Sequence, residues 1–321
     1  MWNYIARRLL QMIPIVIGVS IIIFLIINLV PGNFIDAKAQ TSHMSQEQIQ
    51  HLKDLYGIND PIHVKYVKWI SGAVHGDFGD SFTHQKPVSK VISTFVWNSF
   101  LIAIIAFILE LLIAIPIGII SATHQYSKTD YFFTVIALIG ISLPSFFLGL
   151  VLIKVFAVDL KWLPLAGLDT PGTSFAGIQF LLDRLKHVIL PSLVLAFLSI
   201  GQLMRYTRTS VLEIIKQDYI RTARAKGLSE KVVVYKHALR NALIPVVTYI
   251  GISLPSLFAG AIITESIFGI PGIGKIALDA VTKRDYPLLM GFSMFVAVLT
   301  LLGNLLSDIL YAVVDPRVKL K

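Results

Sequence analysis

The sequence predicts an all-α membrane protein that crosses the bilayer six times. Its 321 residues are 55% hydrophobic and only 15% charged, with a mean hydropathy of +0.74. That is too little charge to cover the surface of a soluble protein of this size. The chain also contains apolar runs of about 20 residues, the length that spans a bilayer. These runs cover about Leu9–Val30, Ser99–Ile120, Tyr131–Ala157, Val188–Met204, Leu243–Phe268 and Leu288–Val314.

The first run follows Arg7 and Arg8, as in a secretory signal peptide. At about 22 residues, and without a small-residue cleavage pattern, it is better interpreted as a retained span. The chain has no cysteine, which excludes disulfides, thiolate metal sites and lipid-modified cysteine anchors.

The basic residues predict the orientation. The net charge is +9, which in a membrane protein indicates contact with anionic lipid rather than nucleic acid. The segment between the fourth and fifth runs holds nine basic residues, which marks it as cytoplasmic. They are Arg205, Arg208, Lys216, Arg221, Arg224, Lys226, Lys231, Lys236 and Arg240. Both termini are then expected in the cytoplasm.

Residues 31–98 are expected to form a small extracytoplasmic segment. Ser45 and Gln48 have the spacing of a helix-capping box, and Gly57 is suited to the left-handed position after a helix. Asp60 and Pro61 then predict the start of a second helix.

An eleven-residue segment occurs twice, in the third and fifth runs. Ile139–Gly149 reads IGISLPSFFLG and Ile250–Gly260 reads IGISLPSLFAG, with nine identical positions. Each proline removes a helix hydrogen bond, so both spans are expected to kink or break. Ser142 and Ser253 are expected to help satisfy the freed carbonyls of Gly140 and Gly251.

Interrupted spans in corresponding positions indicate a translocation pathway. Its candidate residues are Ser142, Pro144, Ser145, Ser253, Pro255, Ser256 and Glu110. Close helix packing is the alternative for the small residues. Glu110 lies mid-span, where an unpaired charge is costly, so a hydrogen-bonded structural carboxyl is an equal alternative for it.

The cytoplasmic segment predicts a helix, a turn and a second helix. Helix-forming residues continue to Lys226, Gly227 provides a stop, and Ser229 is a natural N-cap. Ala223 and Ala225 are expected to leave the backbone accessible to another protein, with basic groups at the rim. Composition alone favours a solvated or lipid-facing basic surface instead.

This segment resembles the conserved cytoplasmic loop of binding-protein-dependent ABC importer permeases, in their dipeptide/oligopeptide branch. The similarity rests on Asp218–Leu228 and His237–Ala242. Thr222-Ala223-Arg224 replaces the Glu-Ala-Ala that names the wider class, as is common in the peptide branch. Further matches are Val30–Gly32, Gly76–Ser81, Trp162–Pro164, Phe268–Gly274, Arg284–Pro287 and Asp315–Arg317.

The resemblance implies a type I ABC importer permease in a bacterial or archaeal cytoplasmic (inner) membrane. Residues 1–97 would form the N-terminal span and external segment, and residues 98–321 a five-span core with a coupling loop at 205–243. In that loop a helix docks on an ATPase through Tyr219, Arg221, Thr222, Ala223, Arg224, Ala225, Lys226 and Gly227.

The resemblance also implies a set of partners: a second homologous permease, two cytoplasmic ABC ATPase subunits and an extracytoplasmic peptide-binding protein. ATP and magnesium would be bound by the ATPases, with no cofactor bound by this chain. Gly269–Ile276 has the spacing of a phosphate-binding loop, but Ile276 replaces the required hydroxyl. A transporter subunit is therefore expected, not an enzyme.

Other functions stay open at this point. One alternative is a stand-alone secondary transporter, in which the carboxyl groups of Glu110 and Asp308 couple ion movement to solute transport. The other is a membrane-bound signalling or assembly subunit that transports nothing. Within the importer class, nickel complexes and glutathione are alternative cargoes to peptides.

Overall fold

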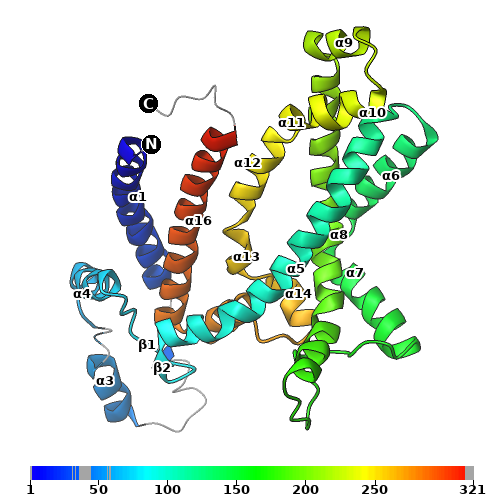
Figure 1. The fold of residues 1–321 in the computed structure, drawn as a ribbon. Coiled ribbons are helices and arrows are strands. Elements are labelled where there is room, and N and C mark those ends of the chain that lie inside the picture. The colour runs from blue at the N-terminus through cyan, green and yellow to red at the C-terminus, as the bar shows by residue number, and fades with distance from the viewer. Residues whose placement is uncertain are drawn as a thin grey trace. The chain divides into compact units, whose positions relative to one another are not determined.

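The computed structural model describes residues 2–30, 32, 34–35, 45–55, 57 and 59–314, without the side chains of residues 2, 3, 52, 55 and 310–314. Figure 1 shows a chain built almost entirely of helices. From the N-terminus the first elements are α1 (Trp2–Leu29), α3 (Gln46–Leu55), α4 (Ile62–Val74), β1 (Asp80–Ser81), β2 (Lys86–Pro87) and α5 (Val88–Thr123). The two short strands pair antiparallel.

Among the described residues, five helical segments are long and apolar enough to cross a membrane, and there are six if a bent helix pair is counted as one span. The five are Tyr4–Leu29, Val88–Thr123, Ile178–Ile215, Ile244–Ile267 and Tyr286–Ile309. The bent pair consists of α6 (Lys128–Ser142) and of α7 (Ser145–Leu152) with the π-helical η1 (Ile153–Asp159). The predicted all-α architecture with six spans is consistent with these segments. The second helix begins at Val88, eleven residues before the predicted run.

Both repeated prolines interrupt their spans, as predicted. At the first, α6 ends at Ser142, α7 begins at Ser145, and the two axes differ by 103°. At the second, α12 (Ile244–Ser253) is followed by the short α13 (Ser256–Ala259) and α14 (Ile262–Ile267). The expected role of Ser253 is wrong. Its hydroxyl donates to the Tyr249 carbonyl at 2.8 Å, because a serine side chain in a helix reaches the carbonyl four residues earlier.

By its internal contacts the chain forms two compact units. Unit 1 comprises residues 1–99, 258–262 and 272–302, and unit 2 comprises 100–257, 263–271 and 303–321. The hydrophobic core of unit 1 joins three helices that are distant in sequence. Val88, Val91 and Ile92 of α5 pack with α15 (Ile273–Thr282) and with Leu288 of α16 (Tyr286–Val314).

Two motifs that lie 204 residues apart in sequence meet inside unit 1. The Ser81 hydroxyl donates to Asp285 Oδ2 at 2.6 Å, and the Thr83 amide donates to the same oxygen at 2.9 Å. Asp285 is fully buried and directly precedes α16, and its Oδ1 accepts from the Leu288 amide. The carboxylate therefore caps α16 and fixes the β1–β2 hairpin on it.

The local helix signals at Ser45, Gly57 and Pro61, in the segment predicted to be extracytoplasmic, are confirmed. The Ser45 amide donates to Gln48 Oε1 and the Gln48 amide donates to Ser45 Oγ, which is the reciprocal capping box. Gly57 has φ +61° shortly after α3, and α4 begins directly after Pro61.

Unit 2 is organised around α8 (Ile178–Ile215), which packs along α6 and α5 (Figure 1). Glycines make these approaches possible. A Cβ on Gly201 of α8 would lie 2.5 Å from the carbonyl oxygen of Ala137, and one on Gly140 would lie 2.9 Å from that of Phe197. Gly140 belongs to the first repeated segment. Its close approach to α8 supports the alternative that small residues of this segment serve helix packing.

Candidate functional site: the cytoplasmic loop and the interrupted spans

The predicted cytoplasmic loop forms a helix–turn–helix within unit 2. The first helix, α9 (Asp218–Ala225), is separated from the end of α8 by two residues. After the turn come α10 (Glu230–Val232), the π-helical η2 (Val233–Ala238) and α11 (Leu239–Ala242). The helix, turn and second helix predicted from Gly227 and Ser229 are confirmed.

One face of α9 is anchored in its own chain. Ile220 is fully buried and Ala223 is 7% exposed, and both pack with Val233 and Ala238 of η2. The expectation that Ala223 leaves the backbone accessible to another protein is therefore wrong. Its methyl group points inward because it is three residues from Ile220, on the same helix face.

The opposite face of α9 is exposed and basic. It carries Tyr219, Arg221, Thr222, Arg224 and Ala225, and the exposed C-cap residue Lys226 follows it. Within the described part of the chain, the one ion pair of Arg221 is a solvated contact with Asp218 at 3.4 Å, so its guanidinium stays available to another surface. The Tyr219 hydroxyl accepts a hydrogen bond from Asn241 at 2.9 Å and so ties α9 to α11.

The turn after α9 is held by backbone geometry and by one ion pair. Gly227 has φ +78° and its amide donates to the Arg224 carbonyl at 2.9 Å. Arg224 Nη2 and Nε donate to the two carboxylate oxygens of Glu230, at 2.6 and 3.0 Å. The hydrogen bonds from Arg224 lower the pKa of Glu230 below its usual value.

The candidate pathway residues lie at the two proline breaks. Ser142 and Pro144 are exposed and Ser145 is half-buried, while Ser253 and Pro255 are half-buried and Ser256 is exposed. The second break has neighbours within unit 2. A Cβ on Gly251 would lie 2.7 Å from Ser307 Cα, and the Pro255 ring lies against Gly303, so this break packs closely on α16.

Glu110 is 5% exposed and has a partner inside unit 2. The Tyr249 hydroxyl donates to Glu110 Oε1 at 2.7 Å, which links α5 to α12. A hydrogen-bonded partner of this kind is what we expect if Glu110 is a structural carboxyl rather than a pathway residue. Its part in a pathway stays a prediction.

Sequence reasoning missed a buried ion pair between α6 and α8. Arg208 Nε donates to Asp130 Oδ1 at 2.8 Å, and its Nη2 donates to Oδ2 at 2.7 Å. The Tyr126 amide also donates to Asp130, and the Asp130 amide donates to the Ser127 hydroxyl. Ser127 and Asp130 have the spacing of a helix-start motif, which was the available signal.

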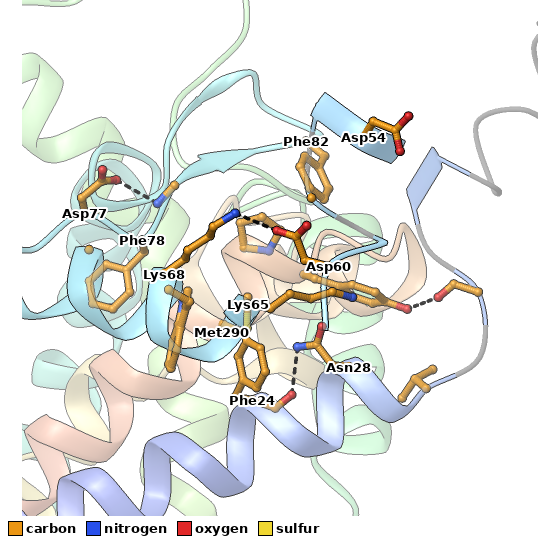
Figure 2. Close-up of a pocket in the computed structure, with 18 residues that line it drawn as sticks. Phe24, Asn28, Asp54, Asp60, Lys65, Lys68, Asp77, Phe78, Phe82 and Met290 are labelled. Carbon is orange, nitrogen blue, oxygen red and sulfur yellow. Dashed lines mark hydrogen bonds and ion pairs between the residues drawn. The ribbon is translucent and has the colours of Figure 1, made fainter. Parts of the chain in front are cut away.

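Unit 1 contains a pocket of about 690 Å³, shown in Figure 2. It is lined by one face of α4, with Lys65, Lys68 and Gly72, and by Phe24 and Asn28 of α1. The hairpin region adds Asp77, Phe78 and Phe82, and the start of α16 adds Tyr286 and Met290. Lys68 Nζ donates to Asp60 Oδ2 at 2.7 Å on the wall of this pocket. No sequence signal pointed to it, since its residues come from separate segments.

The comparisons with known proteins cover the whole chain. Residues 114–320 match the family described as binding-protein-dependent transport system inner membrane component, and residues 1–104 match the family of its N-terminal region. Among the solved structures, one titled as inward-facing conformations of the MetNI methionine ABC transporter matches with a TM-score of 0.53 at 18% identity. The match covers 70% of this chain and 96% of that chain. The predicted type I importer permease fold is thus confirmed.

Curated relatives align from end to end. The oligopeptide transport system permease protein AppB of Bacillus subtilis is 44% identical over 98% of this chain and 99% of its own length. The dipeptide transport system permease protein DppB of Alkalihalophilus pseudofirmus is 39% identical over 99% and 100%. The glutathione transport system permease protein GsiC of Salmonella paratyphi A is 36% identical over 100% of both chains. The chain belongs to the binding-protein-dependent transport family, as a multi-pass permease subunit of an ABC importer.

Proposed function

We propose that this permease moves short peptides inward across the cytoplasmic membrane, after an extracytoplasmic binding protein delivers them. The observation that carries the proposal is full-length similarity to permeases named for oligopeptides and dipeptides. The relative named for glutathione is a permease for a tripeptide-like cargo. Nickel complexes are the less favoured cargo because none of the relatives compared above carries that name.

The partners follow from the same proposal. A second homologous permease completes the pathway, and two ABC ATPase subunits bind ATP and magnesium and supply the energy. The contact surface for an ATPase is the exposed face of α9 with Arg221, Thr222, Ala225 and Lys226. Ile220 and Ala223 act from the buried face, where they hold α9 against η2. Arg221 and Lys226 lie around the small side chain of Ala225, and their positive charges would complement acidic residues at the edges of a groove on the ATPase.

The pathway is proposed to run along the two proline breaks, at Ser142–Ser145 and Ser253–Ser256. Interrupted helices expose backbone carbonyls and amides, which can hydrogen-bond a passing peptide without being specific for its side chains. Exposed Ser142 and Ser256 add hydroxyl groups there. Glu110 is proposed to support this region through Tyr249.

The decisive experiment is reconstitution of the complex. The chain is purified with its associated subunits, placed in liposomes and supplied with the binding protein and a labelled dipeptide or oligopeptide. Uptake that requires ATP and is insensitive to proton and sodium gradients supports the proposal. Uptake that follows an ion gradient without ATP favours secondary transport, and a complete complex that moves no peptide overturns the proposed cargo.

The proposed orientation has its own test, because the chain lacks cysteine. A single Cys at Ser229 is expected to be shielded from an impermeant thiol reagent added outside, and one at Thr83 to be labelled. Both termini are then cytoplasmic. The reverse labelling pattern would overturn the orientation.

A further inference from the structure

We propose that the pocket of unit 1 is a binding site for a short zwitterionic peptide, with the ammonium of Lys65 receiving the peptide's terminal carboxylate. This inference rests on the proposed peptide cargo and names a site for it outside the proline breaks. The pocket's 690 Å³ lies within the range of small-molecule sites.

The ammonium group of Lys65 is available to bind a ligand in this pocket. Within the part of the chain that the structure describes, no hydrogen bond or ion pair engages its ammonium, whereas Lys68 is held by Asp60 at 2.7 Å. Both lysines lie on the same face of α4, three residues apart, and Figure 2 shows them projecting toward the pocket. An incoming carboxylate gains a charge-assisted bond from Lys65 without breaking the Lys68–Asp60 pair.

A second donor lines the same pocket. Asn28 Nδ2 uses one of its two hydrogens on the Phe24 carbonyl, at 2.9 Å, so the other can serve a ligand oxygen. The half-buried rings of Phe78 and Phe82 form apolar wall surface (Figure 2). A side chain next to the peptide's carboxylate can pack on these rings.

The remaining charges favour a zwitterion over a simple anion. Asp54 and Asp77 also line the pocket. Among the described residues, each accepts side-chain hydrogen bonds from neutral amides alone, from Gln50 and Asn59 to Asp54 and from Gly79 to Asp77. Two carboxylates that no described cation pairs with disfavour an anionic lipid headgroup, whereas the terminal ammonium of a peptide complements them.

The test compares a tripeptide ending in phenylalanine with the same peptide carrying a C-terminal amide. Binding is measured to the complete transporter in phosphatidylcholine nanodiscs, without the binding protein. Loss of the carboxylate is expected to weaken binding about tenfold, the effect of removing one charge-assisted hydrogen bond. Lys65→Gln is expected to weaken binding of the free acid by a similar factor and to leave the amide almost unchanged.

Lys90→Gln is the matched control, since it removes the same charge from an exposed position of α5 outside the pocket. It is expected to leave both affinities unchanged. Equal affinity for acid and amide, or the same losses with Lys90→Gln, would overturn the site. If phosphatidylglycerol in the nanodisc abolishes the Lys65-dependent binding, a lipid headgroup is the occupant and the peptide assignment is overturned.

ATP-driven uptake on the same preparations separates this inference from the proposed function. Intact peptide uptake without an acid–amide difference in binding defeats the pocket assignment alone. Absence of any peptide uptake by the wild-type complex defeats the proposed function itself.

Discussion

Arg208 of α8 holds Asp130 of α6 through two parallel hydrogen bonds of 2.8 and 2.7 Å. The pair is shielded, with the Asp130 side chain 4% and the Arg208 side chain 24% exposed. Arg208 lies ten residues before α9, and α6 ends at the first proline break. The pair therefore joins the helix that leads into the proposed coupling loop to the helix that ends at a candidate pathway residue.

Asp130→Asn is expected to destabilise unit 2 by about 2–3 kcal/mol, because it leaves a largely buried guanidinium without its counter-charge. The measurement is the thermal unfolding midpoint of the purified complex in detergent. Asp218→Asn is the control, since it removes a carboxylate from the solvated pair with Arg221. Equal midpoints for wild type and Asp130→Asn would show that the pair does not stabilise the fold.

Gly201→Ala is expected to weaken the α6–α8 packing by about 1–3 kcal/mol, because its Cβ would overlap the Ala137 carbonyl. Gly18→Ala in α1 is the matched control. No atom lies within 4 Å of a Cβ built there, so alanine is expected to be neutral or slightly stabilising in that helix. Thermal unfolding of both variants decides the matter, and equal effects would argue against close packing at Gly201.

Gly227→Val is expected to reduce the amount of ATPase that copurifies with the permease. At φ +78° a β-branched residue is strained, so the turn that presents the end of α9 would change. Space is not the cause, since no atom lies within 4 Å of a Cβ built at this position. Gly227→Asn separates the two effects, because asparagine tolerates the left-handed region and should retain most of the ATPase. Unchanged ATPase recovery with valine would contradict a docking role for this turn.

The Arg224–Glu230 pair is expected to make the loop pH-dependent. The folded-state pKa of Glu230 is lowered, so the stabilisation is present above the ordinary glutamate pKa and is lost as the pH falls through the lowered value. Hydrogen exchange of α9 amides, corrected for intrinsic rates, measures this. Glu230→Gln should reduce protection near pH 7 and make little difference below the lowered pKa. A constant difference between the two proteins at every pH would exclude the ion pair as its cause.

Sequence alone predicted the features that depend on neighbouring residues. Pro144 and Pro255 break their helices because each lacks an amide hydrogen. Ser45 and Gln48 cap a helix because the partners are three residues apart. Gly227 stops α9 because glycine accepts positive φ without strain. The apolar runs gave the spans for the same reason, since their length is a local property.

Tertiary structure decided which of these residues face the chain itself and which remain free for a partner. Ala223 is buried because η2 packs against α9. The carboxylate of Glu110 accepts a hydrogen bond from Tyr249, which lies 139 residues later in the sequence. The Ser81–Asp285 bond and the Arg208–Asp130 pair likewise join segments that only packing brings together. A sequence read residue by residue fixes local backbone preferences, but the partner of a buried polar group depends on how distant helices pack.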